Sequence, residues 1–172
     1  MILLQIKVWK KFVRLYMILV RVSGRMEIVS EDPLVIVDFA HTPDGMAQIL
    51  NALKEKEILV VFGAGGNRDK SKRPLMGKVA ASLAKHLYIT SDNPRHEDPE
   101  LIIEDILSGI EDRSSVSVNV NRKEAIKKAL KDQKKNETVL ILGKGDETYQ
   151  IIYDKRFPFD DREVAKELLL LK

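Results

Sequence analysis

Glycines and cations are concentrated in one segment, residues 62–74, which reads FGAGGNRDKSKRP and follows an apolar run. Glycine lets the backbone turn tightly and approach a ligand closely, and Arg and Lys bind carboxylates or phosphates through charge-assisted hydrogen bonds. The cations are Arg68, Lys70, Lys72 and Arg73. This segment predicts a loop that holds an anion, with a solvated basic turn as the alternative.

The glycine-rich segment does not fit a nucleotide-hydrolysing P-loop. A P-loop reads G-x-x-x-x-G-K-[ST], and its second glycine lets backbone amides wrap the phosphate. Here Asp69 precedes Lys70 and would place a carboxylate among the phosphate oxygens. The dinucleotide pattern G-x-G-x-x-G also fails, because Arg68 stands at its third glycine. In the later segment GKGDET, Lys144 is followed by glycine rather than by Ser or Thr.

A second polar cluster reads DNPR, residues 92–95. Pro94 restricts Asn93 to extended geometry, so Arg95 is presented as a fixed fork that can bind a carboxylate through two hydrogen bonds. Asp92 and Asn93 add an acceptor and an amide. The alternative is a turn without a ligand.

An acidic group lies in the third cluster, where Glu147 follows Gly143 by four residues and Gly145 permits close approach. A glutamate opposite Arg68 and Arg95 suits a zwitterion, since it would bind an ammonium while the arginines bind carboxylates. The alternative for Glu147 is complementarity to a helix dipole.

Short apolar segments precede these clusters and alternate with helical patterns. Strands are expected at 34–39, 58–62, 86–91, 116–120 and 139–142, with a weaker one at 150–153; helices are expected at about 43–55, 74–85, 98–111, 122–135 and 160–171. Thr42 and Asp98, each followed by proline, predict helix starts, as does Asp160 or Asp161. The alternation predicts a three-layer α/β domain with a mostly parallel sheet. Because the carboxyl ends of parallel strands meet at one edge, the clusters should form one binding site.

The composition is that of a globular protein, with 44% hydrophobic and 32% charged residues. A net charge of +3, spread along the chain, does not favour nucleic acid as a partner. The absence of cysteine excludes disulfides and thiolate metal sites. Three scattered histidines predict no zinc site.

Residues 1–22 read MILLQIKVWKKFVRLYMILVRV and form a segment of separate character. Its charge-free runs reach only six residues, whereas a membrane-spanning helix needs about 20. We expect an amphipathic segment that packs on another surface, with attachment to a membrane surface as the alternative. The chain is expected to be cytoplasmic.

Five segments, taken in order, resemble the C-terminal domain of the Mur ligases: GRMEIV, VDFAHTPDGM, VFGAGGNRDKSKRPLMGKVA, SDNPRHEDPELIIEDI and LILGKGDETYQII. The likeness is strongest to the members that add the third amino acid to UDP-N-acetylmuramoyl-L-alanyl-D-glutamate. It implies an ATP-dependent acid–amino-acid ligase of peptidoglycan synthesis, in which ATP and Mg²⁺ activate the peptide carboxylate as an acyl phosphate that an amine then attacks.

Mur ligases have three domains, and the resemblance assigns residues 23–172 to the third, a Rossmann-like domain that brings in the amino acid. The first domain of the family holds the UDP-sugar, and the central one carries the P-loop and the groups that bind Mg²⁺. The resemblance therefore implies that this chain is inactive alone, that its metal-binding groups lie elsewhere, and that UDP-N-acetylmuramoyl-dipeptide is held by the other two domains.

The resemblance also implies roles for individual residues. The amino-acid-binding positions are Arg68, Asp92, Asn93, Pro94, Arg95, Gly143 and Glu147. In members with DNPR the arginine holds the distal carboxylate of meso-diaminopimelate, while the glycine carbonyl and the glutamate hold the distal ammonium. Arg25, Asp38 and His41 match positions near the ATP ribose and base; the alternative for His41 is capping of the next helix.

One departure from the family pattern leaves the substrate open. The family usually reads GKGHE, and here Asp146 replaces the histidine, which adds a negative charge and makes L-lysine the alternative to meso-diaminopimelate. Another hypothesis is a free-standing, non-catalytic protein that binds a diamino acid or a nucleotide and self-associates through residues 1–22. A folylpolyglutamate-type ligase would share DFAHTPD, but DNPR and GKGDE disfavour it.

Overall fold

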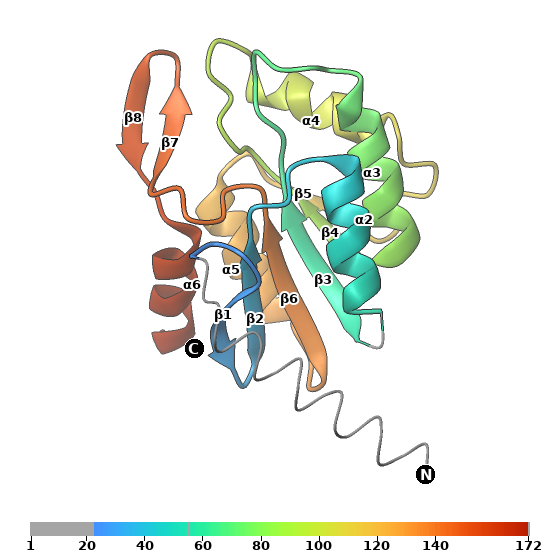
Figure 1. Ribbon diagram of the computed structural model, residues 1–172, viewed down its shortest axis with the longest axis vertical. Coiled ribbons are helices and arrows are strands. Elements are labelled where there is room, and N and C mark those ends of the chain that lie inside the picture. Colours follow the sequence, from blue (N-terminus) through green and yellow to red (C-terminus); the bar gives the residue numbers. More distant parts are fainter. Residues whose placement is uncertain (1–22, 55, 172) are drawn as a thin grey trace.

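A computed structural model describes residues 23–54 and 56–171. Its main sheet has the strand order β1-β2-β6-β3-β4-β5 (Figure 1). The strands are β1 (Glu27–Glu31), β2 (Leu34–Asp38), β3 (Glu57–Phe62), β4 (His86–Ile89), β5 (Val116–Val118) and β6 (Glu137–Leu142). β1 pairs antiparallel with β2, and every other pairing in this sheet is parallel. The predicted mostly parallel sheet is confirmed.

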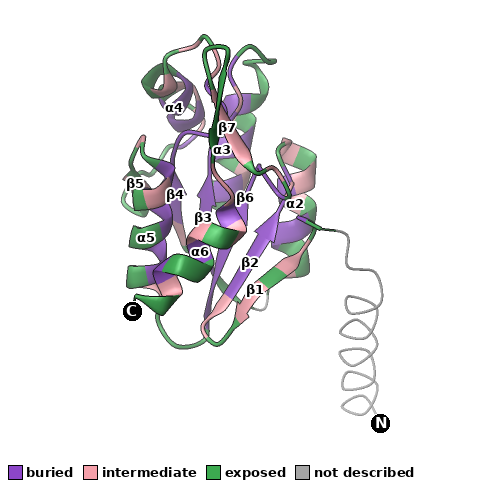
Figure 2. Ribbon diagram, turned by 90° about the vertical axis from the view of Figure 1, so that its left-hand side faces the viewer, coloured by how far each residue is buried: buried purple, intermediate pink, exposed green. Residues whose placement is uncertain are grey.

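The central strands are continuous apolar runs because both of their faces are covered. All six residues of β6 are buried, and β6 pairs with β2 on one side and with β3 on the other. In Figure 2 the buried residues run through the middle of the sheet, and exposed residues lie on the outer faces of the helices and in the loops.

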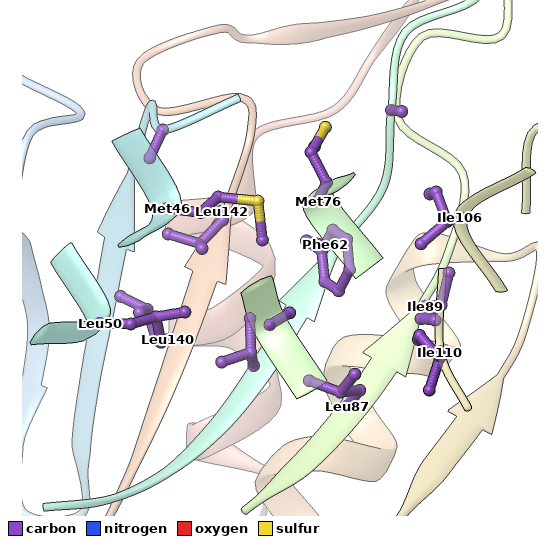
Figure 3. Close-up of a cluster of buried hydrophobic side chains, with 14 of the residues drawn as sticks. Met46, Leu50, Phe62, Met76, Leu87, Ile89, Ile106, Ile110, Leu140 and Leu142 are labelled. Carbon is purple, nitrogen blue, oxygen red and sulfur yellow. The ribbon is translucent and has the colours of Figure 1, made fainter. Parts of the chain in front are cut away.

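Helices cover both faces of the sheet and complete the three layers. They are α2 (Pro43–Ala52), α3 (Lys72–Leu83), α4 (Pro99–Leu107), α5 (Arg122–Asp132) and α6 (Asp161–Leu170). One apolar cluster joins α2, α3 and α4 to one face, where Met46 and Met76 lie near Phe62 and Leu142 (Figure 3). A second cluster joins α5 and α6 to the other face, through residues such as Ile126.

Side-chain caps start the helices where the sequence predicts them. Thr42 Oγ1 accepts a hydrogen bond from the Gly45 amide at 3.1 Å, and Asp98 accepts one from the Glu100 amide at 2.8 Å. Asp160, rather than its neighbour, caps α6. These caps satisfy amides that would otherwise lack a partner at the first turn.

Two strands were not predicted from the sequence, and one predicted strand lies outside the main sheet. β1 is a half-exposed edge strand, and β8 (Lys155–Pro158) is exposed along its length, so neither shows an apolar run. β7 (Tyr149–Ile152) pairs antiparallel with β8 in a separate hairpin. β4 and β5 end before their predicted limits, at Ile89 and Val118, and the residues that follow them, such as Thr90, belong to loops. The expectations for residues 1–22 lie outside the described residues.

Within residues 23–54 and 56–171, no helix is long and apolar enough to cross a membrane.

Candidate functional site

A cavity of about 410 Å³ opens at the carboxyl edge of the sheet. Loops after β2, β3, β4 and β6 line it, which confirms the prediction that the four polar segments converge. Its lining includes His41, Arg68, Asp92, Asn93, Arg95, Gly143 and Glu147. β6 lies between β2 and β3, and the chain leaves it toward α6, on the face opposite α2 and α3. The connections after the neighbouring strands β2 and β6 therefore run over opposite faces of the sheet. Ligands of open α/β sheets bind at such a point, outside the carboxyl ends of the strands.

The glycine-rich loop and the DNPR loop are fixed against each other. The Gly66 amide donates to the Asn93 carbonyl at 2.8 Å, and Arg95 Nη1 donates to the Gly66 carbonyl at 2.9 Å. A Cβ on Gly66 would lie 1.8 Å from the Pro94 carbonyl oxygen. The glycine therefore permits a close approach between two loops, and Pro94 contributes to this packing rather than to the lining of the cavity.

Arg95 is held by its backbone and by one nitrogen of its guanidinium. Its φ of +52° is in the left-handed region, and Nη1 bonds the Gly66 carbonyl and, at 3.4 Å, the Asn93 carbonyl. Among the described residues, Nε and Nη2 have no hydrogen-bond partner. Arg95 therefore presents a pre-oriented cation to the cavity, where Arg68 adds a second, more exposed one.

Glu147 supplies a negative charge to the cavity, which Asp69 and Asp92 also line. Its Oε2 accepts from Asn93 Nδ2 at 2.8 Å and from Lys144 Nζ at 3.0 Å. Partial burial acts to raise the pKa of Glu147, but these hydrogen bonds outweigh it and hold the pKa below the ordinary value of 4.5. The carboxylate is thus ionised at neutral pH and suited to bind an ammonium.

Asp92 is a buried carboxyl in the lining of the cavity. Burial raises its pKa, although Arg122 and Lys144 act in the opposite direction. Its Oδ2 lies 2.5 Å from the position that a Cβ on Gly143 would take. Gly143, with φ +115°, is required here both by its backbone conformation and by this carboxyl.

The three residues matched to the nucleotide positions fall into two settings. Asp38 is buried outside the cavity lining, and its carboxylate accepts from the Ala40 amide at 2.7 Å and the Met26 amide at 2.8 Å. Arg25 lies 4.6 Å from the ring centroid of Phe39, and His41 packs edge-on against the same ring. Phe39 and His41 line the cavity. Arg25, Phe39 and His41 together therefore form an aromatic and cationic platform at its edge.

Part of the predicted anion-binding loop is used for structure instead. Arg73 is 1% exposed and donates to Glu97 and, at 2.8 Å, to Asp105. Its Nη2 bonds the Gly65 carbonyl at 3.1 Å, while Lys70 pairs with Glu97 at 3.1 Å. Lys70 and Arg73 are therefore paired with carboxylates of the protein itself, and the prediction that they bind an anionic ligand is corrected. The sequence could not show this, because Glu97 and Asp105 are distant in the chain.

Replacing Glu97 by glutamine should make the free energy of unfolding depend less on pH in the acidic range. The hydrogen bond from Arg73 is the main reason that the pKa of Glu97 falls to about 2. Because the folded-state pKa is lowered, the contribution is present above pH 4.5 and is lost as the pH falls toward 2. We expect the variant to lose about 1.5–3 kcal/mol at pH 7 and the difference from wild type to shrink below pH 4.5, as urea unfolding at several pH values would measure. The exposed Glu163, changed to glutamine, is the control; a difference that does not change with pH would contradict the assignment.

The fold and the cavity define an α/β domain that binds a small charged ligand at the carboxyl edge of its sheet. Residues 24–145 match the sequence model of a family described as "Mur ligase, glutamate ligase domain". The chain belongs to this family.

Similar proteins include two bacterial ligases. A UDP-N-acetylmuramoyl-L-alanyl-D-glutamate–2,6-diaminopimelate ligase of Helicobacter hepaticus is 60% identical over 145 residues, which are 84% of this chain and 31% of that protein. The ligase of the same name from Wolinella succinogenes is 55% identical over 148 residues, 86% of this chain and 34% of that protein. The chain thus spans about a third of the length of these relatives.

A solved structure of a ligase with this name superposes with a TM-score of 0.81 at 42% identity, covering 86% of this chain and 31% of the other. A folylpolyglutamate synthase of Mycobacterium tuberculosis gives a TM-score of 0.58 at 21% identity over 72% of this chain and 30% of that one. The second likeness shows the fold alone.

Proposed function

We propose that residues 23–172 are the amino-acid-binding domain of a ligase that adds meso-diaminopimelate to UDP-N-acetylmuramoyl-L-alanyl-D-glutamate in peptidoglycan synthesis. The observation that carries the proposal is the charge pattern of the cavity. Arg68, Arg95 and the ionised Glu147 line it together. The other cations of the lining, Lys72 and Arg73, are paired with Asp69 and with Glu97 and Asp105. This pattern is complementary to an amino acid that carries a carboxylate and an ammonium at its far end.

The hydrogen-bonding capacity of the cavity suggests how the ligand is oriented. Arg95 Nε and Nη2 have no partner among the described residues and would donate to the distal carboxylate. The Gly143 carbonyl and Glu147 Oε1 would accept from the distal ammonium. Arg68, on the opposite loop, would bind another carboxylate. With the far end held in this way, the remaining amino group is the one left to attack an activated carboxyl, which is how positioning contributes to the rate.

The residues matched to the nucleotide positions suggest how this domain would contact ATP. The platform of Arg25, Phe39 and His41 would contact the base and ribose of ATP, with Asp38 supporting its backbone. Among the described residues, no group of three or more His, Cys, Asp or Glu could hold a metal ion. As the resemblance to the family implies, Mg²⁺, the ATP phosphates and the UDP-N-acetylmuramoyl-dipeptide would be held by other parts of the ligase, where Mg²⁺ would supply charge stabilisation.

The position of Asp146 favours meso-diaminopimelate over L-lysine. Asp146 is exposed and does not line the cavity, and its carbonyl accepts from Arg162 at 3.5 Å. The extra charge thus lies outside the proposed ligand position. L-lysine has no distal carboxylate, so it would leave Arg95 without an anion.

Thermal unfolding with each amino acid tests the proposal. A ligand at 100 times its Kd adds about 2.7 kcal/mol of stability, which for this chain length raises the Tm by about 5 °C or more. We expect this rise with meso-diaminopimelate and a much smaller one with L-lysine at equal concentration. A larger rise with L-lysine would contradict the substrate, and no rise with either would contradict binding by this chain alone.

A further inference from the structure

A buried lysine lies beneath the proposed ammonium position and outside the cavity lining. The side chain of Lys144 is 0% exposed. Its Nζ donates to the Tyr149 carbonyl at 2.5 Å and to Glu147 Oε2 at 3.0 Å, and lies 3.4 Å from Asn93 Oδ1. A buried ammonium is costly unless it is paired and hydrogen-bonded, and this one has three acceptors. Because Lys144 does not line the cavity, a ligand there would not touch it.

The partners of Lys144 also determine the orientation of the Asn93 amide. Asn93 Oδ1 accepts from the Ile151 amide at 2.8 Å and faces Lys144, while Nδ2 donates to Glu147 Oε2 at 2.8 Å. Lys144, Asn93 and Glu147 therefore form a closed triangle in which each side chain fixes the other two. A rotated Asn93 amide would place donors against Lys144 and Ile151.

The hairpin β7–β8 supports this triangle from outside the cavity. Gln150 Nε2 donates to the Asp92 carbonyl at 2.5 Å, and the Arg95 amide donates to the Ile151 carbonyl at 3.1 Å. The Tyr153 amide donates back to the Arg95 carbonyl at 2.7 Å. The hairpin thus extends along the DNPR loop as an additional strand would, and it supplies the carbonyl that anchors Lys144.

One oxygen of Glu147 is committed to the protein and the other is not. Oε2 accepts both protein hydrogen bonds, and Oε1 has no partner among the described residues. Removing Lys144 would leave Glu147 with the neutral Asn93 donor and the more distant charge of Arg95, against the partial burial that opposes its ionisation. The buried Asp92 and Arg122, of opposite charge, also act on this site. Lys144 therefore contributes, with Asn93, to both the charge and the direction of the carboxylate.

We propose that Lys144 is a positioning residue, which holds Glu147 ionised and aligned for the ligand ammonium without touching the ligand. The proposal rests on the proposed function, because the role of Glu147 as an ammonium acceptor belongs to it. Positioning through a charge has a measurable signature: the proton affinity of Glu147, and the pH range over which the ligand binds, should both depend on Lys144.

The experiment compares wild type with Lys144→Met, which preserves the length of the side chain and removes its charge. The side-chain NH₂ resonance of Asn93, followed by NMR from pH 2.5 to 8, reports the ionisation of Glu147. In wild type we expect a midpoint below the ordinary 4.5. In the variant the midpoint should rise by about one pH unit or more, the effect of removing a close opposite charge. Lys128→Met, on the exposed side of α5, should leave it unchanged.

A binding arm uses meso-diaminopimelate and calorimetry at pH 5.5 and pH 7.5. We expect the loss of affinity caused by Lys144→Met to be about twofold greater at pH 5.5 than at pH 7.5, because Glu147 would be only partly ionised at the lower pH. Binding to wild type and Lys128→Met should be nearly equal at both. An unchanged NMR midpoint, or an affinity that Lys144→Met leaves unchanged at both pH values, would overturn the positioning role. If Lys144→Met does not fold, a wild-type midpoint at or above 4.5 overturns it. Absence of binding to wild type would contradict the proposed function alone, because the NMR titration uses no ligand.

Discussion

Replacing Asp161 by asparagine is expected to destabilise the folded chain by about 3–5 kcal/mol, the range for breaking a buried ion pair by removing one partner. Arg122 and Asp161 are both fully buried and join α5 to the start of α6 through two bonds of 2.8 Å. Arg122 also donates to the Leu142 carbonyl at 2.9 Å. The variant would leave a guanidinium without its main counter-charge behind the ligand site, and urea unfolding at pH 7 measures the effect.

The same two helices provide the control for this prediction. Lys123 and Glu167 form an ion pair between α5 and α6 at 3.0 Å, but both side chains are well exposed. Glu167→Gln should therefore cost no more than about 1 kcal/mol. A double variant, Arg122→Met with Asp161→Leu, should recover much of the lost stability because it removes both charges of the buried pair. Equal effects of Asp161→Asn and Glu167→Gln would contradict the assigned importance of burial.

Replacing Arg95 by alanine is expected to weaken meso-diaminopimelate binding by about 30-fold to several thousand-fold, corresponding to the 2–5 kcal/mol lost when one partner of a buried charge pair is removed. Arg95→Lys should recover little of this, since an ammonium cannot reproduce two parallel hydrogen bonds. The variants lose the bond from Nη1 to the Gly66 carbonyl, but the backbone of Arg95 is still held by β7 and the Gly66 amide still bonds the Asn93 carbonyl, so the loop should stay in place. Calorimetry with this chain measures the affinity.

An arginine far from the cavity serves as the control. Arg113 lies before β5, at the amino edge of the sheet, and donates to the Leu107 carbonyl. Arg113→Ala should leave the affinity for meso-diaminopimelate within about twofold of wild type. Equal affinities of Arg95→Ala and wild type would contradict the binding role of Arg95, and with it the proposed orientation of the ligand.

The sequence predicts the layers and the place of the cavity because both follow from local patterns. Continuous apolar runs specify buried parallel strands, and Thr42 and Asp98 cap their helices by contacts within a few residues. Once the strands are parallel, their carboxyl ends share an edge, so His41, Arg68 and Glu147 could be grouped without knowing any distance.

The inner support of the site could not be predicted because it depends on contacts between distant segments. Lys144 reads as one more cation in a glycine-rich turn, and nothing local shows that its partners are Asn93 and the Tyr149 carbonyl. Arg73 looks the same as Arg68 in the sequence, yet one is buried against Glu97 and the other is exposed. Burial distinguishes them, and burial is a property of the folded chain.

The position of β6 between β2 and β3 has a consequence for how the chain folds. β2 and β3 precede β6 in the chain, but they do not pair with each other; each pairs with β6, which follows β4 and β5. During synthesis, the middle of the sheet therefore cannot form until the chain up to residue 142 has left the ribosome. Pairing over such long separations slows folding, and meanwhile the apolar edges of β2 and β3 lack their partner, so nascent chains are most prone to aggregation during this interval.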